Sequence, residues 1–256
     1  MKWVVKIKAI ILAAGYATRL YPLTEHQPKA LLIVGSTTIL SHIMIKLEEV
    51  DEVDEVIIVT NDRFEGNFMQ WKKSVQTKKK ITVLNDGTKT NEDRMGAVRD
   101  MNFALDGMHG NDDVMVIASD NLFGFSLKDF VAYYTQKNAS VVALYDMKEK
   151  QKVAKKYGVA VLAPDGRVIE FEEKPEHPKT SIIGTACYIF TRSAIKKLGN
   201  YLAEGHRKDN PGDFLKWTAQ NEPVYGWVFK EHWFDIGSFE ALEEARMRYE
   251  KVEVPQ

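Results

Sequence analysis

The sequence predicts an α/β fold built on an open, mostly parallel sheet with helices on both faces. Through the first 145 residues or so, apolar runs of strand length alternate with amphipathic stretches of helix length. These apolar runs are continuous rather than alternating, as expected of strands that are covered on both faces. After residue 150 the pattern changes to shorter runs separated by turn residues, which predicts an antiparallel region in the second half.

The first half contains five predicted strands and three predicted helices. The strands are expected at residues 9–13, 56–60, 81–84, 114–118 and 141–145. The helices are expected from apolar residues at helical spacing within 39–47, 95–108 and 127–134. This order predicts right-handed β-α connections and therefore a Rossmann-like sheet.

The second half begins with a predicted hairpin. Residues 159–162 and 168–172 flank Pro164-Asp165-Gly166, which is a turn sequence. Beyond it we expect a strand at 182–190, helices at 193–203 and 213–220, extended segments at 224–228 and 232–234, and a closing helix at 239–251. No linker, repeat or low-complexity segment interrupts the chain, so residues 1–256 are predicted to form one domain with halves at about 1–145 and 146–256.

Composition excludes several classes of partner. A chain of 256 residues with 45% hydrophobic residues can bury one core without disulfides, and Cys187 is the sole cysteine. A net charge of −1 without a clustered basic surface argues against nucleic-acid binding. No apolar run approaches the roughly 18 residues of a membrane span, and the run at 9–14 is too short for a signal peptide. A cytoplasmic protein is expected.

The loop after the first predicted strand is a candidate phosphate site, because open α/β folds bind ligands at the carboxyl ends of their strands. Its small residues let backbone N–H groups approach a phosphate, while Arg19 and Lys29 supply positive charge. An ordinary turn with two surface cations explains the same residues. The phosphate-binding patterns GxxxxGK[ST] and GxGxxG are absent. The candidate residues of this loop are Leu12, Ala13, Ala14, Gly15, Thr18 and Arg19.

This loop resembles the signature of the sugar-1-phosphate nucleotidylyltransferases, L-A-G-G-x-G-T-R-L-x-P-x-T followed by a lysine. The sequence has Ala14 and Ala17 where that pattern usually has glycine. Since glycine tolerates a positive φ and alanine does not, Ala17 is expected to affect the loop geometry. The resemblance implies that the loop binds a nucleoside triphosphate, that Arg19 holds its β- and γ-phosphates, and that Lys29 steadies the α-phosphorus.

Two aspartates far apart in the chain are candidate metal ligands. Mg²⁺ commonly takes one or two carboxylates and completes its shell with phosphate and water. On their own, Asp120 and Asp235 are more typical of turns. However, Ser119-Asp120-Asn121 resembles the family's G-D-N, and residues 233–238 resemble its W-x-D-x-G-[ST]. The resemblance implies that both aspartates hold a catalytic Mg²⁺, that Asp120 also contacts the nucleotide, and that Trp233 belongs to the sugar site.

A third motif concerns the sugar phosphate. Phe171-Glu172-Glu173-Lys174-Pro175 matches the family's F-x-E-K-P, although a charged strand end stopped by proline would look the same. The resemblance implies that Glu173 binds sugar hydroxyls and that Lys174 contacts the phosphate in a catalytic role. Gly158 and Thr185 stand where the family has further contacts to the sugar.

The nucleobase remains open at the level of sequence. The family reads the base within residues 85–96, where this chain offers Asn85, Gly87, Asn91 and Gly96 but lacks the Gln and Pro of thymidylyl- and uridylyltransferases. An asparagine amide can pair with either a uracil-type or a cytosine-type edge. dTTP or UTP with glucose 1-phosphate is the first expectation, and CTP with glucose 1-phosphate is the alternative.

Two rival functions follow from the same residues. A cytidylyltransferase for phosphocholine or an alditol phosphate shares the first loop but not the later motifs. A nucleotide-sugar-binding regulatory subunit would bind the nucleotide sugar without turnover. The presence of four charged candidate residues favours catalysis instead: Arg19, Lys29, Asp120 and Asp235. The scattered histidines form no zinc pattern. The expected partners are therefore a nucleoside triphosphate and a sugar 1-phosphate, and homo-oligomer formation is expected only by analogy.

Overall fold

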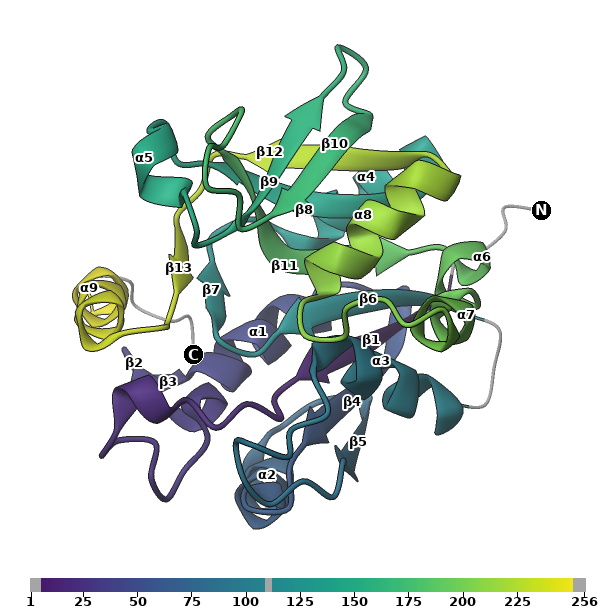
Figure 1. The fold of residues 1–256 in the computed structure, drawn as a ribbon. Helices are drawn as coiled ribbons and strands as arrows, with labels where there is room; N and C mark the ends of the chain where they lie inside the picture. Colours follow the sequence, from purple (N-terminus) through teal and green to yellow (C-terminus); the bar gives the residue numbers. More distant parts are fainter. Residues whose placement is uncertain (1–5, 109–111, 251–256) are drawn as a thin grey trace.

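The computed structural model describes residues 6–108 and 112–250. Its centre is a nine-stranded mixed sheet with helices on both faces (Figure 1). The strands of this sheet are β1 (Ile7–Leu12), β4 (Val53–Thr60), β5 (Lys80–Asn85), β6 (Asp113–Ala118), β8 (Ser140–Asp146), β9 (Gly158–Leu162), β10 (Val168–Glu173), β11 (Ile182–Phe190) and β12 (Val224–Phe229). Two short two-stranded sheets are formed by β2 (Ile33–Val34) with β3 (Thr37–Thr38), and by β7 (Asn121–Phe123) with β13 (Trp233–Asp235).

The sheet is parallel at its centre, as the continuous apolar runs predict. Strands β5, β4, β1 and β6 are parallel neighbours. The fifth predicted strand, β8, does not lie beside β6, because the antiparallel strand β11 pairs with both of them. β12 then adds to β8 in parallel. β9 and β10 form the predicted hairpin, and Gly166 in its turn has a φ of 87°.

Helices cover each face of the sheet. One apolar cluster contains residues of α1 (Ile39–Glu48), α2 (Glu65–Ser74) and α4 (Leu127–Lys137). A second cluster, on the other face, contains residues of α3 (Ala97–Asp106), α6 (Arg192–Ile195), α7 (Leu198–Ala203) and α8 (Pro211–Asn221). α9 (Phe239–Tyr249) packs against β2 and β13, and α5 (Lys150–Val153) precedes the hairpin. Two 3₁₀-helices, η1 (Thr18–Leu20) and η2 (Lys29–Leu31), follow β1.

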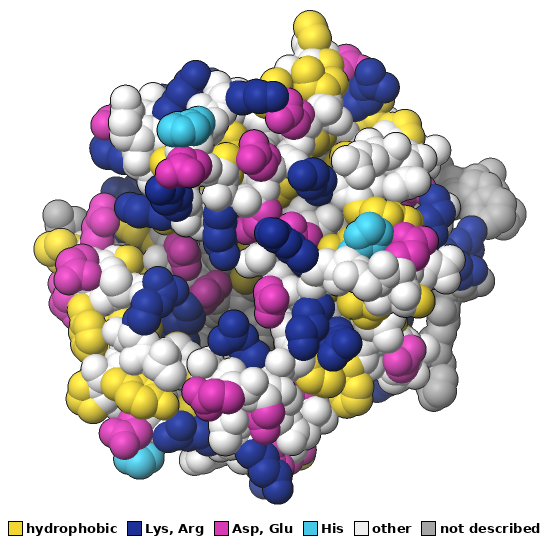
Figure 2. Space-filling view, viewed as in Figure 1, with side chains coloured by type: hydrophobic (Ala, Val, Ile, Leu, Met, Phe, Trp, Pro, Cys, Tyr) yellow, Lys and Arg dark blue, Asp and Glu magenta, His cyan; other side chains and the backbone are white. Residues whose placement is uncertain are grey.

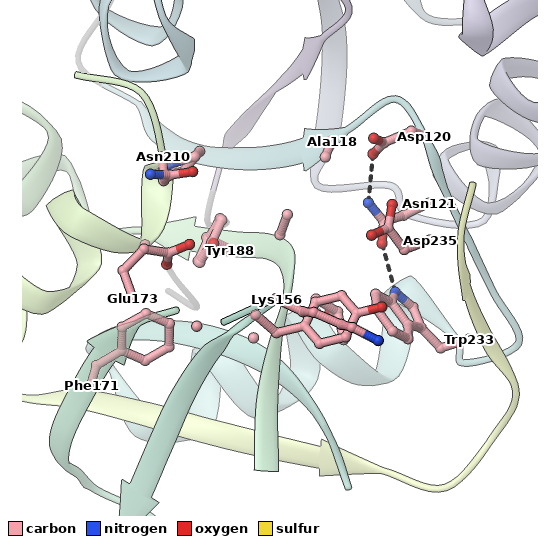
Figure 3. Close-up of a pocket in the computed structure, with 17 residues that line it drawn as sticks. Ala118, Asp120, Asn121, Lys156, Phe171, Glu173, Tyr188, Asn210, Trp233 and Asp235 are labelled. Atoms are coloured by element: carbon pink, nitrogen blue, oxygen red, sulfur yellow. Dashed lines mark hydrogen bonds between the residues drawn. The ribbon is translucent and has the colours of Figure 1, made fainter. Parts of the chain in front are cut away.

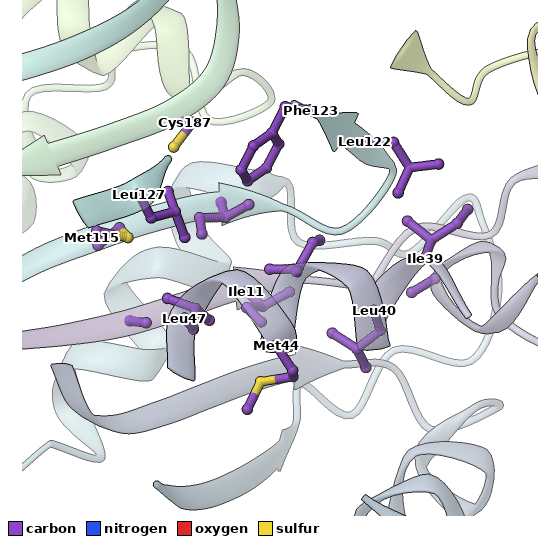
Figure 4. Packing of buried hydrophobic residues seen from close by; sticks show 14 of the residues in the cluster. Ile11, Ile39, Leu40, Met44, Leu47, Met115, Leu122, Phe123, Leu127 and Cys187 are labelled. Atoms are coloured by element: carbon purple, nitrogen blue, oxygen red, sulfur yellow. The ribbon is translucent and has the colours of Figure 1, made fainter. Parts of the chain in front are cut away.

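Side chains of alternating sheet positions build the two cores. Ile11 points into the first cluster beside Met44 and Leu47 of α1, and Cys187 lies in the same core (Figure 4). Ile10 belongs to the second cluster. Cys187 is therefore a small buried apolar group, as the sequence predicts.

Several element boundaries differ from the sequence predictions. The helix predicted from residue 95 begins at Ala97, because Gly96 has a φ of 94° and caps it. The single helix predicted at 193–203 is divided into α6 and α7, where the Lys197 amide bonds the Ala194 carbonyl in 3₁₀ fashion. α9 ends at Tyr249, and residue 251, the predicted end, lies outside the described residues.

Helix α2 is absent from the sequence prediction. Only Phe68 and Trp71 of its ten residues are buried, and Gly66 and Asn67 are poor helix formers. Its helical pattern is therefore too weak to recognise in isolation. Among residues 6–108 and 112–250, no helix has the length and apolar character needed to cross a membrane.

Candidate active site

The loop after β1 presents exposed backbone at the carboxyl edge of the sheet. Its start is fixed by neighbouring strands, since the Ala13 amide donates to the Val59 carbonyl at 2.8 Å and the Leu12 carbonyl accepts from the Ser119 amide at 3.1 Å. The Asn61 side chain donates to the Ala14 carbonyl at 2.9 Å. Gly15 is exposed, and a side chain added there would meet nothing within 4 Å. The loop is thus anchored at its base and open at its tip.

Ala17 keeps the backbone conformation that glycine would favour. Its φ of 46° and ψ of 40° lie in the left-handed region, where an alanine is uncommon. The Thr24 hydroxyl donates to its carbonyl at 2.8 Å and helps to hold this turn. Immediately after it, η1 begins at Thr18 and carries Arg19.

The two cations of the opening region lie beside the two aspartates. A Cβ built on Gly237 would be 3.6 Å from Nη2 of Arg19 and 3.7 Å from Oδ1 of Asp235, so both groups flank Gly237, and the charge of Arg19 lowers the pKa of Asp235. Lys29, at the start of η2, places its Nζ 2.6 Å from Oδ2 of Asp120.

The pairing of β7 with β13 brings Asp120 and Asp235 together. Asp235 lies opposite Asn121 in this pairing, and the Ile236 amide donates to the Asp120 carbonyl at 2.9 Å. Both aspartates line the same cavity, which Figure 3 shows. Two segments that are distant in the sequence therefore converge, as the metal-site prediction requires.

The electrostatics of this pair suit a divalent cation. Burial raises the pKa of Asp235 to about 6, and the negative charge of Asp120 adds to that rise while Lys29 and Arg19 partly offset it. Burial opposes ionisation of Asp120 too, but the charge and hydrogen bond of Lys29 lower its pKa below the usual value. A cation between two such carboxylates would relieve their repulsion. Within the described residues no group of three or more His, Cys, Asp or Glu side chains could hold a metal, so a metal ion here needs oxygens from phosphate or water.

A short hydrogen-bond chain orients Asp120. Nδ2 of Asn121 donates to Oδ1 of Asp120 at 2.8 Å, and Nε1 of Trp233 donates to Oδ1 of Asn121 at 2.6 Å (Figure 3). The Tyr157 ring meets the Trp233 ring edge-on, with centroids 5.6 Å apart. Trp233 thus lines the cavity and also supports a proposed metal ligand.

The cavity has a volume of about 190 Å³ and opens between β11, the β9–β10 hairpin and β13. In the space-filling view this face is hollowed near its centre, with acidic side chains inside and Lys and Arg side chains around it (Figure 2). The predicted sugar-site residues Gly158, Glu173, Thr185 and Trp233 all line it, together with Asp120 and Asp235.

Glu173 is enclosed by glycine backbone. A Cβ on Gly158 would lie 2.7 Å from Oε2 of Glu173, and a Cβ on Gly212 would lie 2.3 Å from it. Burial raises the pKa of Glu173 to about 7, against the charge of Lys174. A carboxyl group that is neutral part of the time can both donate to and accept from a sugar hydroxyl.

Lys174 reaches the rim of this cavity from the end of β10. Its φ is 51°, its amide donates to the Tyr157 carbonyl at 3.1 Å, and its Nζ donates to Oδ1 of Asn210 at 2.9 Å. The side chain is half-exposed. It does not line the cavity itself, but its charge lowers the pKa of Asp235.

A bulge in β11 shapes the opposite wall. The register of β11 against β8 shifts between Gly184 and Tyr188, and Ala186 has a φ of 52°. The Thr185 hydroxyl donates to the Ala143 carbonyl at 2.9 Å, so its hydrogen is already used within the fold while its oxygen can still accept. Ala17, Lys174 and Ala186 are three non-glycine residues with left-handed backbone around one site, which is typical of functional loops.

The predicted base-reading residues lie outside this cavity. Nδ2 of Asn85 donates to Glu65 at 3.0 Å and its Oδ1 accepts from the Gly87 amide at 2.8 Å. Oδ1 of Asn91 accepts from Arg94 at 3.2 Å. A Cβ on Gly96 would lie 2.8 Å from the Lys208 carbonyl, so this glycine packs closely against a loop. Their role in nucleotide binding stays a prediction.

Sequence reasoning missed several lining residues. Lys156 lines the cavity as well, and Asn210 and Gly212 come from the start of α8. Tyr188 projects from β11. None belongs to a motif quoted above. The signal that was present, Asn210 followed by Pro211 and Gly212, indicates only a helix start.

Comparison with known proteins places this geometry in a family. Residues 8–252 match the family described as nucleotidyl transferase. The chain belongs to the nucleotidyl transferase family. This confirms the resemblance of the sequence motifs and the enzyme class that they imply.

Individual relatives of this nucleotidyl transferase agree with the fold. The bifunctional protein GlmU of Methanocaldococcus jannaschii is 28% identical over 245 residues, which are 95% of this chain but 55% of that protein. A Bacillus anthracis crystal structure, provisionally described as a glucose-1-phosphate thymidylyltransferase in complex with a sucrose, is 25% identical with a TM-score of 0.83 over 98% of both chains. A UDP-glucose pyrophosphorylase complexed with UDP-glucose is 21% identical with a TM-score of 0.81 over 96% of this chain and 99% of that one, and shows the shared fold.

Proposed function

We propose that this nucleotidyl transferase joins a nucleoside triphosphate to a sugar 1-phosphate and releases pyrophosphate. The observation that carries the proposal is the convergence of Asp120, Asp235, Lys29 and Arg19 at one edge of a cavity whose other end is enclosed around Glu173. The charged end suits phosphates, and Glu173 at the enclosed end offers a carboxyl group to the hydroxyls of a sugar.

The proposed reaction is a direct in-line displacement. A phosphate oxygen of the sugar 1-phosphate forms a bond to the α-phosphorus, and the bond from that phosphorus to the bridging oxygen of the β-phosphate breaks. The electron pair leaves with pyrophosphate. The attacking oxygen is already anionic, so no protein nucleophile or general base is needed, and catalysis consists of positioning and charge stabilisation.

Each charged residue has a distinct part in this proposal. Arg19 binds the departing β- and γ-phosphates, and Lys29 offsets charge at the α-phosphate. Lys174 holds the sugar phosphate against its repulsion from the nucleotide. Mg²⁺, held by Asp120 and Asp235, would neutralise the α-phosphate and order both substrates.

The finer assignment of substrates follows the sequence expectation. We propose a pyrimidine nucleotide, with dTTP or UTP and glucose 1-phosphate as the first pair to test. The thymidylyltransferase description of the Bacillus anthracis relative supports this choice. CTP is the alternative, because residues 85–96 lack the Gln and Pro of thymidylyl- and uridylyltransferases. The action of the enzyme on soluble substrates fits the proposed cytoplasmic location.

The deciding experiment measures pyrophosphate release over a grid of ATP, GTP, CTP, UTP and dTTP against several sugar 1-phosphates, with phosphocholine and an alditol phosphate as further acceptors. One strong nucleotide–sugar pair that requires Mg²⁺ supports the proposal. Turnover with phosphocholine or the alditol phosphate alone moves the enzyme to the other acceptor class. Nucleotide-sugar binding with no turnover anywhere in the grid would support the regulatory subunit instead.

A further inference from the structure

The ammonium group of Lys29 forms an ion pair with the carboxylate of Asp120, which is a proposed ligand of Mg²⁺. Its Nζ lies 2.6 Å from Oδ2 of Asp120, and Nδ2 of Asn121 takes Oδ1 at 2.8 Å. Both oxygens of Asp120 therefore already have partners. Asp235, by contrast, makes no hydrogen bond or ion pair through its carboxylate among the contacts of the described residues.

Lys29 and a metal ion would compete electrostatically for Oδ2 of Asp120. Ligation places a cation roughly 2.0–2.1 Å from a carboxylate oxygen, so an ammonium group 2.6 Å from the same oxygen would lie close to that cation. Two like charges at such separation repel strongly in a partly buried site, and the Lys29 side chain is 16% exposed. The ammonium group at Oδ2 therefore weakens metal binding to this carboxylate until Lys29 moves away.

The structure around Lys29 allows such an exchange. Lys29 is the first residue of the short helix η2 and directly follows Pro28. Lysine carries its charge on a flexible four-carbon chain and can move from a carboxylate to a nearby phosphate with little change of backbone. Arg19, already beside Asp235, marks where phosphate oxygens would be received.

We propose that Lys29 is a placeholder for the metal ion: it holds Asp120 in position in the free enzyme and exchanges with Mg²⁺ when the nucleotide offers it a phosphate. The proposal rests on the metal site of the proposed function. It makes metal and nucleotide binding mutually dependent, because the nucleotide removes Lys29 from the metal's ligand and the metal frees Lys29 for the nucleotide.

The test is a titration of nucleotide-free protein with Mn²⁺. Electron paramagnetic resonance measures the concentration of unbound Mn²⁺ at each step and so gives the affinity. It needs no turnover. Lys29→Met removes the competing charge, and Lys29→Gln removes it while keeping a donor for Asp120. Both variants are expected to bind Mn²⁺ about tenfold more tightly than the wild type, the scale of one lost charge contact. Lys29→Arg keeps the charge and is expected to bind as the wild type does.

Lys8→Met is a matched control. Lys8, near the start of β1, forms ion pairs with Asp54 at 2.7 Å and Glu55 at 3.4 Å on β4, so its removal changes net charge equally without touching Asp120. Its Mn²⁺ affinity should stay at the wild-type value. Adding Asp120→Asn to Lys29→Met should abolish the gain, because the freed ligand is lost.

The proposed exchange would be wrong if Lys29→Met and Lys29→Gln bound Mn²⁺ as tightly as the wild type or more weakly. An equal gain in Lys8→Met would overturn it too, since net charge alone would then explain the result. Circular dichroism establishes that each variant is folded, and Lys29→Gln serves if Lys29→Met is not. Failure of every nucleotide–sugar pair in the turnover grid would reject the proposed function and leave this titration readable.

Discussion

Replacing Glu173 with glutamine should stabilise the protein at alkaline pH and change its stability little at acidic pH. Glu173 is enclosed by Gly158 and Gly212, and its side chain is 11% exposed. Burial raises its pKa to about 7, partly offset by Lys174. Glutamine has nearly the shape of the protonated acid and stays neutral at every pH, so it removes the cost of burying a charge.

The sign and size of the effect follow from proton linkage. Below pH 4.5 both the folded and the unfolded states hold the proton, and the group contributes nothing that depends on pH. As pH rises, the unfolded state loses its proton first, so the free energy of unfolding falls until the folded group is also ionised. A rise in pKa from the usual 4.5 to about 7 corresponds to a loss of about 3 kcal/mol. The side chain is too buried for solvent to screen much of this.

Urea unfolding at pH 5 and pH 8.5 measures the effect as a difference between variants, so that other titrating groups cancel. Glu173→Gln should gain about 2–3 kcal/mol over the wild type between these two pH values. Glu172→Gln is the matched control, because Glu172 is the exposed neighbour on β10. A gain below about 1 kcal/mol in Glu173→Gln, or an equal gain in Glu172→Gln, would refute the reasoning.

Three further predictions concern the loop and the sugar pocket. Arg19→Ala should lower kcat by roughly 10²–10³, the effect of deleting one preorganised donor, and a loss below tenfold would remove Arg19 from the site. Ala17→Gly should raise the free energy of unfolding by about 1 kcal/mol, or a few degrees in Tm, because the φ of 46° costs alanine more than glycine; a lower Tm would contradict this. Gly158→Ala should raise KM for the sugar 1-phosphate about tenfold or more and leave KM for the nucleotide unchanged, since the added Cβ would lie 2.5 Å from the Phe171 ring; equal rises in both KM values would argue against a separate sugar site.

The parallel centre of the sheet could be predicted because its strands are apolar throughout. β1 and β4 are buried on both faces, and the sequence shows this burial as continuous apolar runs such as Ile10-Ile11 and Val56–Val59. The insertion of β11 between β6 and β8 could not be predicted in this way. β11 is as apolar as its neighbours, and its place depends on pairing between segments far apart in the chain.

The candidate site, like the sheet, could be predicted from the sequence only in part. Asp120 and Asp235 could be named because each lies in a short motif, although their proximity is created by the pairing of β7 with β13. Gly212 could not be named, since its contact with Glu173 exists only after α8 packs on β10. The ion pair between Lys29 and Asp120 likewise depends on where η2 lies relative to β7. Motifs carry the chemistry of single groups, whereas tertiary packing decides which groups meet.

The most direct measurement is anomalous diffraction from crystals soaked with Mn²⁺ and the nucleoside triphosphate selected by the turnover grid. One metal peak should lie within about 2.5 Å of a carboxylate oxygen of both Asp120 and Asp235 and touch the α-phosphate, with Arg19 on the outer phosphates. A metal ion bound to the nucleotide with neither aspartate as ligand would contradict the proposed convergence of these groups on one phosphorus atom.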